Sequence, residues 1–308
     1  MVPADTRIKG ILAYVEEGNL SPSDNIDNEG FKLFLSRLPD YYMREFDGPS
    51  FGFDTIPPTP GLLDPWVVDS LVGPLLTTAW HQFSPFNDSC PTWSGGHAYA
   101  GCLAIATAQV LARFRQPTTL YGHTYDWDEI MTGPEPQSNA GKASVAQFVH
   151  DIGQYIGTDY NYNDSGFSRA IFTDAYYYLD NLGFDCFPQA SYSLPSYDFD
   201  LCMQSFNDGC PVLICGNDSL KFNAGHAWVL DGGAIRENVR VFNNTPIYQY
   251  LIHCNWGWNH TPSSNGYFES GVFDNYLKIA DTLTRSSDKP RHAYWELYIY
   301  HHIQPKQK

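Results

Sequence analysis

The sequence predicts an α+β fold, with a helical half followed by an antiparallel β half. Apolar residues recur at helical spacing between residues 102 and 206. After residue 210 they form short β-branched and aromatic runs, separated by Gly, Asn and Pro. Hydrophobic residues make up 43% of the 308 residues and charged residues 17%, which provides enough apolar surface for a packed core. Segregation of this kind places the helices at one side of an antiparallel sheet.

The first 72 residues are expected to form a small N-terminal piece and a linker. Residues 11–15 fit a short strand, and Phe31, Phe34, Leu38 and Tyr42 recur at helical spacing. Residues 48–61 are dense in Gly, Pro, Ser and Thr, which is typical of an exposed linker. We therefore expect an N-terminal piece at 1–47, a linker at 48–72 and the main domain at 73–308.

The main domain is expected to begin with a helix that starts at Cys102. Leu103, Val110 and Phe114 belong to one apolar stripe, which Pro117 ends. Further helices are expected at 145–156, at 168–182 with Ser168 as N-cap, and at 199–206. Strands are expected at 211–215, 227–230, 239–242, 248–255 and 293–303.

Composition excludes several classes of function. Asp and Glu number 34 against 18 for Lys and Arg, and the resulting charge of −16 repels phosphate backbones, so no nucleic-acid partner is expected. No apolar run approaches the ~20 residues of a membrane-spanning helix. The seven cysteines form no C-x-x-C pair and the histidines show no metal-ligand spacing. We expect neither a metal nor a cofactor.

Four polar residues occur in the order Gln82, Cys102, His226 and Asn255. Gln82 lies in a loop rich in aromatic and turn residues, Cys102 opens a helix, His226 opens a strand and Asn255 closes another. A cysteine at a helix N-terminus gains thiolate character, because the unpaired N–H groups and the helix dipole favour negative charge. Residues of these types in these settings predict acyl transfer by a cysteine nucleophile.

Each residue has a chemical role in this hypothesis. His226 stabilises the thiolate and protonates the leaving amine, since its pKa suits both steps. Asn255 holds the imidazole in one orientation through its side-chain carbonyl, and Trp256 shields that bond from water. The backbone N–H of Cys102 and the side-chain amide of Gln82 stabilise the anionic tetrahedral intermediate.

Taken singly, the same residues also fit structural roles. A cysteine in an apolar setting is as often a buried core thiol, and a histidine ahead of a strand is more often a structural one. Asp231, in the strand that follows His226, fits a structural role or a site role and is not assigned. Only the joint order and the setting of each residue favour catalysis.

Around these residues the sequence resembles the streptopain family of bacterial cysteine peptidases, which have a papain-like fold. The resemblance implies Cys102 as nucleophile, His226 as base and acid, Asn255 as orienting residue and Gln82 as oxyanion donor. It extends from about residue 71 to 270 and rests on six blocks in the family's order: Pro74-Leu-Leu-Thr-Thr-Ala-Trp-His-Gln-Phe-Ser-Pro-Phe-Asn87, Cys90-Pro91, Gly101-Cys-Leu-Ala-Ile-Ala-Thr-Ala-Gln-Val110, Gly225-His-Ala-Trp-Val-Leu-Asp-Gly232, Asn255-Trp-Gly-Trp258 and Gly266-Tyr-Phe268.

The N-terminal piece resembles the later half of the family's inhibitory pro-domain, through residues 5–46. The resemblance implies a zymogen-like chain in which the pro-domain fragment at 1–47 inhibits the catalytic domain until the 48–72 linker is cut. One departure is the segment 259–264, where the family usually continues with Gly-Gly, so we expect an altered loop beside the substrate cleft.

The leading hypothesis is a cysteine endopeptidase that hydrolyses proteins or peptides through a Cys102 thioester, and that is secreted, periplasmic or on the cell surface of a bacterium. The resemblance implies a preference for a hydrophobic side chain two residues before the scissile bond. Two alternatives stay open. Papain-like amidases and acyl transferases of cell-wall peptides use the same machinery, and a catalytically degenerate homologue would keep the cleft for binding alone.

Overall fold

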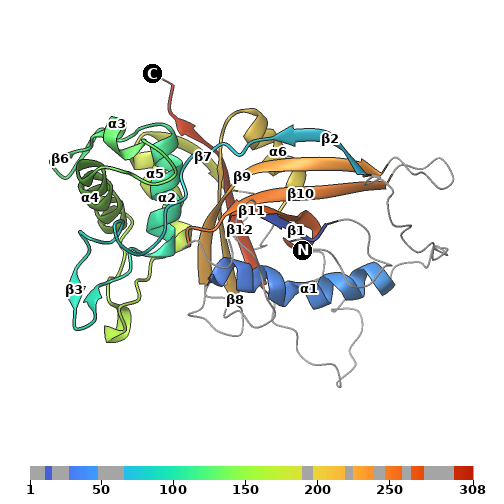
Figure 1. The fold of residues 1–308 in the computed structure, drawn as a ribbon, viewed down its shortest axis with the longest axis horizontal. Helices are drawn as coiled ribbons and strands as arrows, with labels where there is room; N and C mark the ends of the chain where they lie inside the picture. Colours follow the sequence, from blue (N-terminus) through green and yellow to red (C-terminus); the bar gives the residue numbers. More distant parts are fainter. Residues whose placement is uncertain are drawn as a thin grey trace.

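The computed structural model describes residues 11–15, 28–47, 66–188, 197–218, 225–238, 247–258, 265–273 and 295–307. Within these ranges the helices between residues 102 and 181 form a cluster on the left of Figure 1, and a large sheet lies on the right with the two other helices beside it. The α+β class is therefore confirmed. The expected strand at 239–242 and the loop at 259–264 lie outside the described residues.

The sheet has eight strands in the order β1-β11-β10-β9-β8-β12-β7, with β2 paired to β9 outside this path. Every pairing among these described strands is antiparallel. The central strand β9 pairs with β8 through its first half and with β2 through its second. The strand bounds are β1 Ala13–Val15, β2 Trp66–Val72, β7 Phe184–Pro188, β8 Val212–Asp218, β9 Gly225–Asn238, β10 Ile247–Asn255, β11 Gly266–Glu269 and β12 Trp295–Pro305.

The helical half is built around α2, whose residues from Leu103 to Ala112 are all buried. This helix is apolar or small on nearly every side, so it packs against both β9 and α4. The expected capping role of Ser168 is wrong, because its hydroxyl donates to the Tyr99 carbonyl and the helix begins at Ala175. No helix in the described ranges is long and apolar enough to cross a membrane. The helix bounds are α1 Glu29–Asp47, α2 Cys102–Arg113, α3 Trp127–Ile130, α4 Asn139–Tyr155, α5 Ala175–Asn181 and α6 Phe199–Asn207; the short hairpins are β3 Thr92–Trp93 with β4 Gly96–His97 and β5 Thr119–Leu120 with β6 His123–Thr124.

Two hydrophobic cores lie on opposite faces of the sheet. Successive side chains of a strand point to opposite faces, and β9 shows this directly. Ala227 and Val229 pack in the core formed with α2 and α4. Trp228 and Leu230 pack in the second core, which contains residues of α1 and α6. The two residues that flank Ala227 therefore face the α1 side of the sheet.

The N-terminal segment shares the second core instead of forming one of its own. Strand β1 extends the sheet beside β11, with Ala13 opposite Phe268. On α1, Phe31 and Phe34 are 1% and 0% exposed, and Arg37 donates to the Val272 carbonyl in the short 3-10 helix Ser270–Phe273 that follows β11. A segment this short cannot bury enough apolar surface alone, so it folds against the main domain.

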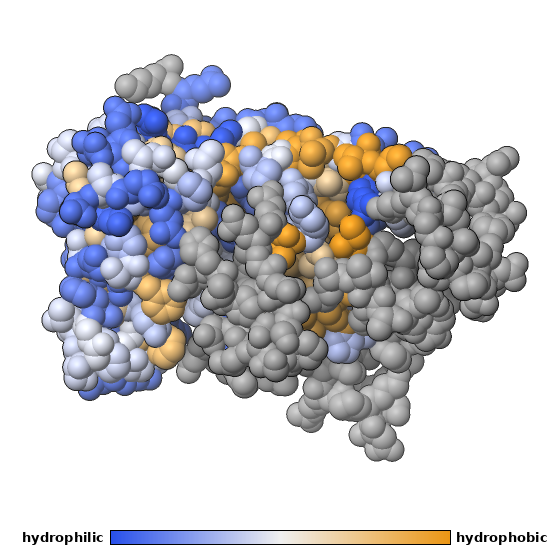
Figure 2. All heavy atoms as spheres, viewed as in Figure 1, coloured by the Kyte–Doolittle hydropathy of each residue, from blue (hydrophilic) through white to orange (hydrophobic). Residues whose placement is uncertain are grey.

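The final part of the expected linker is a strand. Trp66–Val72 forms β2, while residues 48–65 lie outside the described ranges. β2 is exposed at the edge of the sheet, where Figure 2 shows apolar side chains gathered on the surface; Val67, Val68 and Leu71 are among them. Its pairing with β9 makes it part of the main sheet.

Candidate active site

Cys102 is the first residue of α2, as the sequence predicts. The residue before it, Gly101, has a φ of 92°, a conformation that favours glycine and turns the loop into the helix. The backbone N–H groups of Ala227, Leu103 and Cys102 act on the half-buried thiol and favour its anionic form. Burial acts in the opposite direction and is the larger effect, so the pKa of this thiol is raised overall. In this state the surroundings of Cys102 therefore favour the thiol over the thiolate.

His226 is the second residue of β9 and is 3% exposed. Its ring stacks on Trp228 with a centroid separation of 5.9 Å, and its Nε2 donates to the backbone carbonyl of Trp256 over 2.8 Å. Burial lowers the pKa of this imidazole to about 4, which keeps it neutral at physiological pH. In the described ranges no hydrogen bond joins the ring to Cys102 or to Asn255, so the residues that the sequence predicts to be catalytic are not joined in this state.

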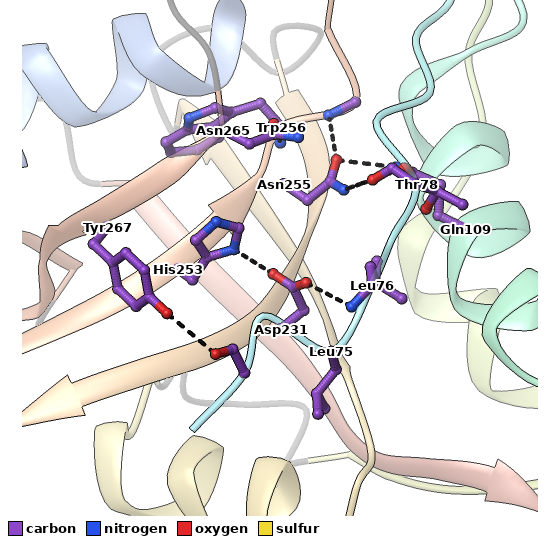
Figure 3. A network of polar contacts seen from close by, with 12 residues as sticks. Leu75, Leu76, Thr78, Gln109, Asp231, His253, Asn255, Trp256, Asn265 and Tyr267 are labelled. Carbon is purple, nitrogen blue, oxygen red and sulfur yellow. Dashed lines mark hydrogen bonds and ion pairs between the residues drawn. The ribbon is translucent and has the colours of Figure 1, made fainter. Parts of the chain in front are cut away.

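Asn255 ends β10 and is enclosed in a network of amide hydrogen bonds, shown in Figure 3. Its Nδ2 donates to the Thr78 carbonyl over 2.7 Å and to Oε1 of Gln109 over 3.2 Å. Its Oδ1 accepts from Nε2 of Gln109 over 3.2 Å and from the Gly257 N–H over 3.4 Å. The orientation of this amide is therefore fixed on both of its polar edges.

A second buried network lies beside the first and contains the carboxylate of Asp231. Its carboxylate is paired with Nδ1 of His253 over 2.5 Å and accepts the N–H of Leu76 over 2.9 Å. The carbonyl of Asp231 accepts the N–H of Leu75 over 2.7 Å. Figure 3 shows that these contacts hold the segment that continues to Thr78. Asp231 thus stabilises the backbone that accepts a hydrogen bond from Asn255.

Gln82 lies near Cys102 through its backbone, and Trp256 lies beside His226. The backbone carbonyl of Gln82 accepts the N–H of Ala100 over 3.1 Å, two residues before Cys102, and the Gln82 side chain is 6% exposed. Trp256 is fully buried and supplies the carbonyl that binds His226. The oxyanion role of Gln82 and the shielding role of Trp256 stay predictions.

The first turn of α1 lies directly on this site. A Cβ added to Gly30 would stand 2.1 Å from Cε3 of Trp256 and 2.9 Å from Cδ2 of His226, so only glycine fits. The carboxylate of Glu29, one residue earlier, interacts electrostatically with both Cys102 and His226. The N-terminal segment therefore covers the imidazole that the sequence predicts to act as base and acid.

Two residues of the site were not found from the sequence. Gln109 follows Cys102 by seven positions, which is about two helical turns, so its place on the same helix face was a readable signal. Gly30 gave no signal, because the local sequence does not show what packs against the second residue of a helix. No cluster of three metal-ligating side chains occurs in the described part of the chain.

The sequence is similar to a known family over most of the main domain. The model of the Peptidase C10 family matches residues 80–268. Thiol protease/hemagglutinin PrtT of Porphyromonas gingivalis is 23% identical over 305 residues, which cover 87% of this chain and 32% of PrtT. Streptopain of Streptococcus pyogenes serotype M28 is 24% identical over 225 residues, which cover 63% of this chain and 50% of streptopain. The chain spans about a third to a half of the length of these relatives.

Two solved structures from Prevotella intermedia share the fold. A fragment of prointerpain A matches with a TM-score of 0.62 and 23% identity, covering 99% of this chain and 91% of the fragment. Active wild-type interpain A cysteine protease matches with a TM-score of 0.51 and 24% identity, covering 76% of this chain and 95% of that protein. These similarities establish the papain-like α+β fold that was expected.

Proposed function

This chain belongs to the Peptidase C10 family, and we propose on that basis that it is a cysteine endopeptidase that hydrolyses peptide bonds in proteins. The observation that supports this most directly is the position of Cys102. Cys102 lies at the N-terminus of a buried helix, and the backbone N–H of Ala227, the residue that follows His226, acts on its sulfur. The start of the strand that carries His226 therefore lies beside the proposed nucleophile, although the two segments are more than one hundred residues apart in the sequence.

In the proposed reaction, the Cys102 thiolate attacks the carbonyl carbon of the scissile peptide bond. The N–H of Cys102 and the amide of Gln82 donate to the oxyanion that forms. The protonated His226 gives its proton to the amine as the C–N bond breaks, which leaves a thioester on the sulfur. His226 then takes a proton from a water molecule that attacks the thioester, and the acid product leaves as the thiol is restored. Asn255 orients the imidazole through both halves of the reaction.

The intact chain is proposed to be latent. His226 bonds to the Trp256 carbonyl beneath Gly30, so it must rotate away from that position to reach Cys102 and Asn255. Residues 1–47 act as the inhibitory pro-segment, and the catalytic domain becomes active when the chain is cut within 48–65. Prointerpain A matches 99% of this chain, against 76% for active interpain A, which supports a zymogen-like form.

The proposed substrates are proteins or peptides, with a hydrophobic side chain two residues before the scissile bond. The relatives named above come from bacteria, and a location outside the cytoplasm, either secreted, periplasmic or on the cell surface, is part of the proposal. Cleavage of a peptide library by the processed chain tests the preference, which is wrong if that position shows no enrichment.

Casein hydrolysis tests the proposed activity. The processed chain should cleave casein, and Cys102→Ala should abolish cleavage because the nucleophile is lost. Cys186→Ala is the matched control, since Cys186 is a buried thiol on strand β7, remote in sequence from the site, and this variant should keep its activity. Casein cleavage that survives Cys102→Ala would overturn the proposal. Amine acceptors and cell-wall peptides in the same assay separate a peptidase from an acyl transferase or amidase.

A further inference from the structure

We propose that Gln109 is a positioning residue. It fixes Asn255, and the loop that runs from Trp80 to Gln82, relative to the helix that carries Cys102. The inference rests on the proposed function, in which Asn255 orients the imidazole of His226. Gln109 itself touches neither the thiol nor the substrate in this proposal. It acts by holding one amide in one orientation.

The orientation of both amides follows from the backbone groups around them. A carbonyl only accepts and an N–H only donates, so the Thr78 carbonyl, at 2.7 Å, identifies Nδ2 of Asn255. The Trp80 N–H, at 3.0 Å, identifies Oε1 of Gln109 in the same way. Once Oε1 is assigned, Nε2 of Gln109 faces Oδ1 of Asn255, and the pair is joined by two hydrogen bonds of 3.2 Å.

The same side chain connects three separate pieces of the site. Gln109 is 0% exposed and lies on α2, two helical turns after Cys102. Its two partners belong to the end of β10 and to the loop that reaches Gln82 two residues after Trp80. A displacement of this one amide therefore changes the position of the nucleophile's helix relative to Asn255 and Gln82 together.

The chemistry of the orienting residue explains why the amide matters. To orient the imidazole, Asn255 must present its oxygen, because the imidazole nitrogen that it meets carries a proton. Loss of Gln109 removes the donor to Oδ1 and one acceptor of Nδ2, which frees the amide to rotate. A rotated amide would place an N–H group against the imidazole N–H, and small misplacements in such sites cost about 10- to 100-fold in rate.

The test uses two variants and one control on the full chain, cut by limited thermolysin within residues 48–65 and kept as the two-piece mixture. Gln109→Met keeps the volume and loses every hydrogen bond. Gln109→Glu keeps the acceptor and regains a donor only when its carboxyl is protonated. Thr107→Val is the matched control, because Thr107 is 1% exposed on the same helix and its hydroxyl has no hydrogen-bond partner in the described residues.

The main readout is the rate at which iodoacetamide alkylates Cys102, measured from about pH 5 to pH 9. In Gln109→Met, the pH dependence of the alkylation rate should shift toward that of an ordinary thiol. The same variant should have a kcat for casein peptides about 10- to 100-fold lower, with little change in KM. Gln109→Glu should regain reactivity as the pH falls, which a merely structural defect would not do. Thr107→Val should match the parent, and thermal unfolding of each variant shows that it is folded.

A Gln109→Met chain with the parent's alkylation profile and kcat would overturn the inference while the peptidase function stands. A parent chain that fails to cleave casein, yet shows the shifted alkylation profile in Gln109→Met, would retain the inference and overturn the peptidase function. The two failures are therefore distinguished by separate measurements.

Discussion

Replacing Gly30 with alanine tests whether α1 holds the site in its latent state. The added Cβ would lie 2.1 Å from a carbon of the Trp256 ring, whereas real Cβ contacts essentially never fall below 3.0 Å. Since Trp256 is 0% exposed, its ring has little room to move, and the helix must shift by about 1 Å. Overpacking of this kind costs about 1–3 kcal/mol, so docking of the pro-segment should weaken roughly 5- to 150-fold.

Helix propensity alone predicts the opposite effect of Gly30→Ala on inhibition, so the direction of the measured change distinguishes the two explanations. Glycine to alanine inside a helix stabilises that helix by up to about 1 kcal/mol, so without the contact at Trp256 and His226 the Gly30→Ala segment would inhibit better. With the contact, the variant should be more active before any cut and should process faster.

The assay follows the initial rate of E-64 labelling of the uncut chain, together with the appearance of the shortened chain on a gel. Lys32→Ala is the control, because Lys32 is on an exposed part of the same helix and its ion pair with Glu29 contributes little. If the Gly30→Ala chain is labelled and processed at the parent's rate or more slowly, α1 does not hold the site in a latent state through this contact.

Three further predictions concern processing, pH and stability. On incubation the parent should shorten by roughly 5 to 7 kDa of its 34.8 kDa through a cut within residues 48–65, while Cys102→Ala stays whole; an equal cut in both chains would exclude self-processing. His226 is buried with its pKa lowered from 6.5 to about 4, so the unfolded chain binds more protons between these values. The stability of the intact chain should therefore fall by up to about 3 kcal/mol as pH drops through this window, and His226→Gln should show a smaller loss in thermal unfolding; equal losses would contradict the assignment. Asp231→Ala leaves buried His253 and the Leu76 N–H without their acceptor, so it should lower the free energy of unfolding by about 3–5 kcal/mol, against little change for the exposed Asp200→Ala; a cost below about 1 kcal/mol would remove the structural role.

The sequence predicted the elements that carry the expected catalytic residues. Helix α2 begins at Cys102, β9 contains His226 and β10 ends at Asn255. These elements could be predicted because their apolar periodicity and the glycine, proline and asparagine residues at their ends are local signals. The α+β class follows from the same local patterns.

The remaining features depend on contacts between distant segments. The pairing of β1 with β11 and of β2 with β9 depends on strands separated by more than one hundred residues, which no local pattern specifies. The bond from His226 to the Trp256 carbonyl joins two strands' ends that lie 30 residues apart in the sequence, and a buried amide such as Gln109 is recognised only when its partners are known. Ser168 illustrates the reverse error, because its hydroxyl was assigned to a helix cap and instead binds the carbonyl of Tyr99.

Mass spectrometry of the processed, folded chain after treatment with E-64 shows whether Cys102 is the nucleophile. The chain contains seven cysteines, and the other six are buried, so we expect a single adduct on Cys102. The adduct should be absent in His226→Ala at neutral pH, because the thiolate then lacks its imidazolium partner. A processed, folded chain in which Cys102 stays unmodified while it still cleaves casein would contradict the assignment of this residue as the nucleophile.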